Sequence, residues 1–166
     1  MTYPLSLVNI VTVLASCACL WSIVPEAQGK PQKLWRLGAP AFLATVVALV
    51  LLAGAVTSFA HDATWTATAL LGTVAGMIRG RSVGVQTDQM WGVVRPQPAL
   101  DGAVTAVGVL AAALIDAISG FFPEGTLPRQ AHVAAASALF AGYLSGRAWT
   151  IGTRAARSPH VDLEHP

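Results

Sequence analysis

Charged residues are scarce in this sequence. Asp, Glu, Lys and Arg together make up 11% of the 166 residues, while hydrophobic residues make up 54% and the mean hydropathy is +0.60. A soluble domain carries roughly 25% charged residues and needs them to cover its surface. The composition therefore predicts an integral membrane protein. The net charge of only +2 gives no sign of a nucleic-acid partner.

Residues with recognisable chemistry are equally few. The two cysteines, Cys17 and Cys19, are two residues apart inside an apolar run, so on a helix they point in different directions and share neither a metal nor a disulfide. The sequence has no phosphate-binding glycine loop, no Cys-x-x-Cys and no zinc-protease motif. We predict no catalytic residue, no metal site and no cofactor.

Long apolar runs are what the chain does have. About 20 helical residues are needed to cross a bilayer core of about 30 Å. Five runs meet or approach this length and predict an all-α, polytopic membrane bundle formed by residues 1–157 as a single domain. The predicted spans are residues 4–24, 37–59, 63–78, 100–122 and 132–151.

The basic residues predict the orientation of this bundle. Nine of the ten Lys and Arg residues fall after the first, third and fifth spans, and only Arg129 falls in the other two loops. Basic loops stay in the cytoplasm. We therefore predict an N-terminus outside, a cytoplasmic C-terminus and a location in the bacterial inner membrane.

The longest connection, between the third and fourth spans, has the pattern of a short cytoplasmic hairpin. Val83, Val85 and Thr87 alternate with small or polar residues, and a turn at Asp88 precedes a second extended run. After the fifth span, residues 158–166 are polar, and we expect a mobile tail.

Glycines four residues apart mark the cytoplasmic ends of the third and fifth spans. Such spacing makes a flat helix face that another helix can approach closely. Each glycine run ends in an arginine, Arg81 or Arg147, which we expect to reach lipid headgroups or, alternatively, to bind an anionic ligand. The helix-packing glycines are Gly72, Gly76, Gly80, Gly142 and Gly146.

The two segments are repeats of one pattern, A-G-x-[I/L]-x-G-R, at residues 75–81 and 141–147. Together with the polar, strand-like segment between them, they resemble the CcdC-like family of small multi-spanning bacterial membrane proteins over residues 67–149. That family is associated with cytochrome c biogenesis by name. The resemblance implies a multi-span membrane protein and no particular activity.

Polar residues within the spans suggest a second kind of site. Asp116 lies well inside the fourth span, and ionisable groups at such depth are candidate functional sites. Asn9, Thr68 and Ser137 come at a similar depth on the first, third and fifth spans. These residues either hydrogen-bond between helices or form an ion or proton site that opens outward.

Two histidines, His61 and His132, lie at the predicted outer boundary. Such a pair could ligate a haem if both were buried and faced each other. We favour solvated histidines at the membrane surface.

Three functions remain open on the sequence alone. The first is a non-enzymatic protein that acts through helix–helix association, as a homo-oligomer or as an accessory or assembly subunit surrounded by lipid and other membrane proteins. The alternative is a small transporter or channel with a protonatable Asp116. The third is a haem-binding redox protein.

Overall fold

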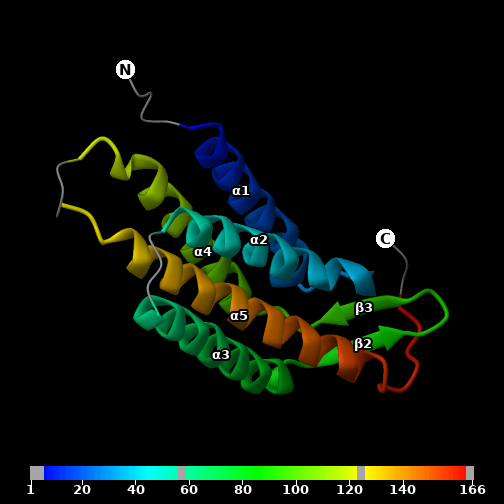
Figure 1. The fold of residues 1–166 in the computed structure, drawn as a ribbon. Coiled ribbons are helices and arrows are strands. Elements are labelled where there is room, and N and C mark those ends of the chain that lie inside the picture. The colour runs from blue at the N-terminus through cyan, green and yellow to red at the C-terminus, as the bar shows by residue number, and fades with distance from the viewer. Residues whose placement is uncertain (1–5, 56–58, 123–125, 164–166) are drawn as a thin grey trace.

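The computed structural model describes residues 6–55, 59–122 and 126–163 as a mostly helical bundle with a small sheet at one end (Figure 1). The elements in chain order are α1 (Leu7–Ala27), β1 (Gln32–Lys33), the 3-10 helix η1 (Leu34–Gly38), α2 (Ala39–Gly54), α3 (Phe59–Ser82), β2 (Val85–Asp88), β3 (Val93–Pro96), α4 (Asp101–Ser119) and α5 (Gln130–Ala155).

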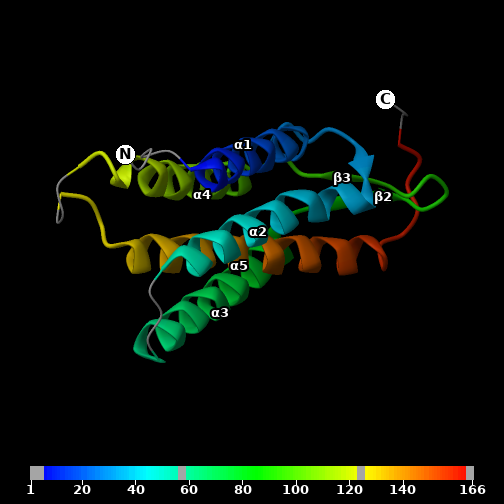
Figure 2. The ribbon, with the colours of Figure 1, turned by 45° about the horizontal axis from the view of Figure 1, so that its top comes forward.

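The helices form three layers, with α5 at the centre. Figure 2 shows α1 and α4 side by side in one layer, α2 and α5 in the next, and α3 beyond them. Helix α5 packs against α2, α3 and α4, whereas α3 packs mainly against α5. A central helix touches protein on most sides, which explains why α5 can carry more polar residues than a lipid-facing helix.

Three of the helices are long and apolar enough to cross a membrane. They are Leu7–Ala27, Leu34–Gly54 and Asp101–Ser119, and within the described residues α3 and α5 do not reach the same hydropathy. In these three helices most side chains are not buried inside the protein. Together these features support a membrane protein, and crossing by α3 and α5 remains a prediction.

The helix boundaries differ from the predicted spans by a few residues. Helix α1 begins after the cap of Ser6, whose Oγ accepts the backbone N–H of Asn9 at 3.2 Å, and it continues past Pro25 to Ala27. It therefore includes Glu26, which the predicted span leaves outside. Helix α2 has its proline in the first turn, where a missing N–H costs least, and ends at Gly54.

The predicted hairpin is present and gains a third strand. Strands β2 and β3 pair antiparallel, and β1 adds to the other edge of β3. The Oδ1 of Asp88 accepts the N–H groups of Met90 and Trp91 at 3.1 and 3.2 Å, and Gly92 closes the turn with φ +61°. A side chain is disfavoured at that φ, so glycine suits the position.

The segment after α5 lies along the hairpin. Thr87 forms a parallel bridge with His160, and the Gln89 side chain donates to the Ser158 carbonyl at 2.7 Å. Leu163 is buried. Residues 158–163 therefore contact the sheet, whereas the sequence predicts a mobile tail there.

The five glycines lie in the contact between α3 and α5. A Cβ added at Gly76 would overlap the Tyr143 carbonyl, and one added at Gly142 would overlap the Ala69 carbonyl. Gly72 and Gly146 meet a carbonyl of the facing helix in the same way, whereas a Cβ at Gly80 would come within 2.9 Å of the Thr150 side chain and 3.0 Å of the Arg147 carbonyl oxygen. The two glycine faces therefore pack against each other within one chain.

We call the end of the bundle that carries β1, β2 and β3 the sheet end. Helices α1, α3 and α5 finish there and α2 and α4 begin there (Figure 1). The nine basic residues that the sequence assigns to one side of the membrane belong to these helix ends and their connections.

Candidate functional site

A buried ion cluster joins three helices at the sheet end. Its centre is Arg147 on α5, which is 2% exposed. Its Nη1 donates to Oε1 of Glu26, near the end of α1, and its Nε donates to Oδ2 of Asp101, the first residue of α4, at 2.9 Å. We call Glu26, Asp101, Arg147 and Tyr143 the charged cluster.

Asp101 is the branching point of the charged cluster. Its Oδ2 also accepts the hydroxyl of Tyr143 at 2.8 Å, and its Oδ1 faces Nη2 of Arg79 on α3 at 3.5 Å. Tyr143 and Arg147 are four residues apart and so lie on one face of α5. Side chains from α1, α3, α4 and α5 therefore meet at one carboxylate and one guanidinium.

The local sequence makes room for this cluster. Gly102 follows Asp101, and a Cβ there would come within 2.9 Å of Cδ1 of Ile23 and 3.5 Å of Nη1 of Arg147. The missing side chain lets the start of α4 approach the end of α1 with the guanidinium between them. The small residue thus serves the same purpose as in other membrane helix contacts.

The charges of the cluster and its neighbour balance. Two carboxylates, Glu26 and Asp101, face two guanidinium groups, Arg147 and Arg79. Buried charges are tolerated when they are paired in this way, and removing one partner leaves an uncompensated charge. Nη2 of Arg147 is buried without a hydrogen-bond partner in the described residues.

The structure corrects the expected role of Arg147. The sequence predicts that Arg81 and Arg147 reach headgroups or share an anionic ligand. Arg81 is exposed, but Arg147 is buried and paired with two carboxylates. The two arginines therefore do not form a common anion site.

Sequence reasoning missed Glu26 and the importance of Asp101. Both lie at the margins of the predicted spans, where an acidic residue is expected to lie at the membrane surface. One signal was present, because Tyr143 and Arg147 are four residues apart and so share one face of the fifth span. Only the packing shows that these margins converge.

A second basic residue, Arg154, holds the end of α3. Its Nη1 donates to the carbonyls of Gly80, Arg81 and Val83 at 3.0, 2.8 and 2.6 Å. The last carbonyls of a helix have no partner within the helix, and a cation there is favourable. Arg154 is a structural link between α5 and α3.

The four residues of the predicted ion site are not brought together by any hydrogen bond among them in the described residues. Asp116 is half-buried, and its Oδ1 accepts Nε2 of Gln130 at 3.2 Å. Ser137 is buried and bonds to the Ala134 carbonyl; Thr68 bonds to the Trp65 carbonyl. Asn9 belongs to the α1 cap.

The positions of the two histidines do not test the expectation that they are solvated. His132, at the start of α5, is exposed. The side chain of His61 lies outside the described part of the chain. The preference for solvated histidines at the membrane surface over a haem site therefore stays a prediction.

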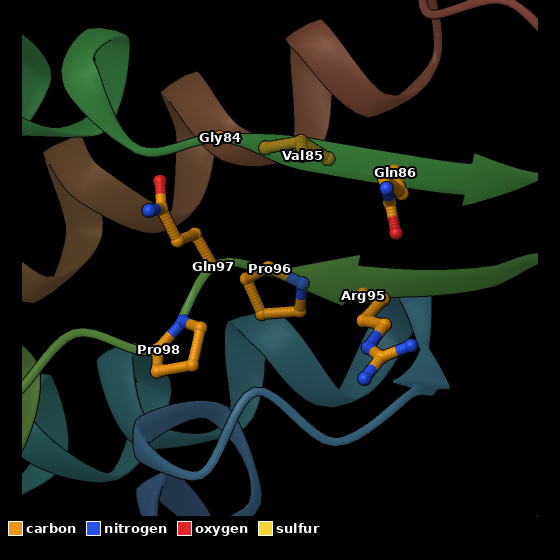
Figure 3. A pocket seen from close by; sticks show the side chains of 7 residues that line it. All are labelled: Gly84, Val85, Gln86, Arg95, Pro96, Gln97 and Pro98. Atoms are coloured by element: carbon orange, nitrogen blue, oxygen red, sulfur yellow. The ribbon is translucent and has the colours of Figure 1, made fainter.

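A further pocket of about 400 Å³ lies beside the hairpin. Figure 3 shows its lining, with Gln97 and Pro98 following β3 and Gly84 preceding β2. Arg95 is its one charged residue, and its Nε donates to the Gly29 carbonyl at 3.2 Å. The pocket combines backbone and amide groups with one engaged cation, so it offers no pair of groups for acid–base chemistry.

Comparisons of the chain with protein families, curated proteins and solved structures give no match. The resemblance to the CcdC-like family therefore stays a prediction from residues 67–149.

Proposed function

We propose that this chain is a non-enzymatic, multi-pass protein of the bacterial inner membrane that works as a subunit. In this proposal it associates through the outer face of α3, either with a second copy of itself or with another membrane protein. The sheet end faces the cytoplasm, and the charged cluster fixes the helices there.

The observation that carries this proposal is the position of α3. It packs mainly against α5, yet it is more polar than the three helices of membrane-crossing hydropathy, and it carries Asp62 and four threonines. The hydroxyls of Thr66, Thr68 and Thr73 donate to carbonyls of α3 itself. A helix surrounded by lipid should still be the most apolar one, because a carboxylate such as that of Asp62 is costly there. A protein neighbour on its outer side would remove that conflict.

The outer face of α3 also has the spacing of a helix-packing seam. Leu71, Val74 and Ile78, which are 65%, 54% and 63% exposed, follow Ala67 at intervals of four, three and four residues. This is the spacing at which two helices interlock side chains. The glycine face of α3 is occupied by α5, so association requires this other face.

Site-specific photocrosslinking tests the proposal in intact membranes. A photoreactive benzoylphenylalanine replaces Val74 on α3 or, as the matched control, Val107 on α4, which is 50% exposed. We expect an adduct of defined mass from position 74 and none from position 107. An adduct of twice the chain mass identifies a homo-oligomer, and another mass identifies a different subunit.

The opposite results would reject the proposal. If position 74 gives no adduct, or both positions give the same pattern, then α3 faces lipid and does not carry association.

A second candidate function is proton transport through the charged cluster. The specific observation in its favour is Nη2 of Arg147, which has no hydrogen-bond partner among the described residues and lies beside the buried Glu26, because ionisable groups within membranes often form relays. Proton flux into proteoliposomes above that of empty vesicles, lost in Glu26→Gln, would favour this candidate. Our proposal predicts no flux for either protein.

A further inference from the structure

We propose that the groove between η1 and α5 binds an anionic phospholipid of the cytoplasmic leaflet. One acyl chain lies in the groove, and its phosphate is held by Lys33, Arg36 and Arg157. This site is separate from the α3 face and does not depend on association.

The groove itself is apolar and open. It has a volume of about 500 Å³, within the range of roughly 300–1,000 Å³ that small ligands occupy. Leu34, Leu37 and Ala41 line one side, and Ala148 and Gly152 line the other. An added Cβ at Gly38 or Gly152 would meet no atom within 4 Å, so the space beside both glycines is free.

Two tryptophans flank the groove. Trp35 on η1 and Trp149 on α5 both line it, and they are 67% and 68% exposed. Exposed tryptophans gather at the depth of lipid headgroups, where an apolar ring with a polar N–H is most stable. They place the groove at the boundary between acyl chains and headgroups.

Three exposed cations are sequence neighbours of residues that line the groove. Lys33 and Arg157 each adjoin a lining residue in the sequence, and Arg36 lies between two of them. All three are exposed, and in the described residues none forms a salt bridge. The guanidinium of Arg36 sits 5.5 Å from the Trp35 ring centre and keeps its N–H donors for a phosphate.

The combination favours an anionic lipid over a neutral one or a protein segment. Basic pockets between helices on the cytoplasmic side suit anionic headgroups, and each nearby Lys or Arg strengthens that preference roughly fivefold. The apolar groove adds contact with the acyl chain. Neither part alone distinguishes a bound lipid from the surrounding bilayer.

Native mass spectrometry of the full chain measures this preference. Delipidated protein is placed in nanodiscs with equal amounts of dioleoylphosphatidylglycerol and dioleoylphosphatidylcholine, extracted in mild detergent, and analysed for retained lipid. We expect retained phosphatidylglycerol to exceed phosphatidylcholine more than about tenfold. Equal retention of the two lipids would overturn the proposal.

Variants separate the groove from the cations. Gly152→Leu fills the open space beside α5 and should abolish retention, while Ala75→Leu, on the exposed side of α3, should bind like the wild type. Arg36→Gln alters an exposed side chain, leaves the fold unchanged and should lower the preference roughly fivefold. Undiminished retention by a folded Gly152→Leu, or an unchanged preference in Arg36→Gln, would overturn the proposal.

A soluble headgroup provides the last arm. An excess of glycerol 3-phosphate should not displace the retained lipid, because it lacks the acyl chain. Complete displacement would show that the cations alone bind phosphate, and this too would overturn the proposal.

Discussion

Arg147 is the residue at the centre of the charged cluster. It connects Glu26 of α1 with Asp101 of α4, and it sits one turn from Tyr143, which shares the same carboxylate. A buried pair of this kind adds little net stability compared with apolar side chains of the same shape. Losing one member is costly, since the other charge remains buried.

Arg147→Met should therefore strongly destabilise the protein. We expect the free energy of unfolding to fall by about 3–5 kcal/mol, because Glu26 and Asp101 lose their partner. Arg157→Met, which removes an exposed charge near the end of the same chain segment, should change it by less than about 0.5 kcal/mol. Thermal unfolding in detergent compares the two, and equal effects would contradict the role of Arg147.

Neutralising both partners should restore much of the loss. In the double variant Glu26→Leu with Arg147→Met, the carboxylate that Arg147→Met leaves unpaired at position 26 is also removed. Its melting temperature should therefore exceed that of Arg147→Met alone. A double variant no more stable than the single one would show that Glu26 and Arg147 do not interact across α1 and α5.

Asp116 should tolerate neutralisation. It is half-buried, and the one hydrogen bond of its carboxyl group in the described residues, from Gln130, can also be accepted by an amide oxygen. Asp116→Asn should change the free energy of unfolding by less than about 0.5 kcal/mol. The check is its melting curve beside the wild type from pH 5 to 9 in sodium and potassium salts; a difference that depends on the cation would favour an ion site.

At the scale of elements, the closest contact is the one between α3 and α5. Each helix presents glycines four residues apart, and the facing backbone occupies the space that side chains would need. Close backbone approach increases the packing contact between helices where lipid provides no hydrophobic driving force.

Gly76→Leu and Gly142→Leu should each separate these helices. We expect a loss of at least about 1–3 kcal/mol, because the new side chain overlaps a backbone carbonyl that cannot move aside. Gly152→Leu, on the open side of α5, should leave stability unchanged or raise it, since leucine favours a helix more than glycine does. Equal melting temperatures for all three variants would contradict the observed packing.

The sequence predicts the elements better than their contacts. Apolar runs locate the helices to within a few residues, and the alternation before Asp88 locates the hairpin, because both patterns are local. The third strand, β1 at Gln32–Lys33, has only two residues and is too short to show an alternation in the sequence. Its place depends on Gly29, whose φ of +65° turns the chain against Pro98.

The candidate site was harder to predict for the same reason. Glu26 and Asp101 are separated by 75 positions, and nothing in the local sequence of either shows that both reach Arg147. Asp116 was predicted as a candidate site because it lies deep within one span. Its depth along the helix does not show which other helix covers it. The convergence is a property of the packing.

At the scale of the whole molecule, the basic residues and the sheet share one end. Lys30, Arg36 and Arg95 belong to connections there, and Arg129 alone lies near the other end. This distribution favours an orientation with the sheet end in the cytoplasm. The proposed lipid site between η1 and α5 depends on that orientation, because the cytoplasmic leaflet carries the anionic lipids.

Cysteine labelling in intact cells tests this orientation most directly. In a background with Cys17→Ala and Cys19→Ala, single cysteines replace Thr126, in the connection before α5, and Pro159, after α5; both positions are exposed. A membrane-impermeant maleimide should label Thr126→Cys in intact cells and label Pro159→Cys only after permeabilisation. The reverse pattern, or labelling of both cysteines in intact cells, would contradict the account.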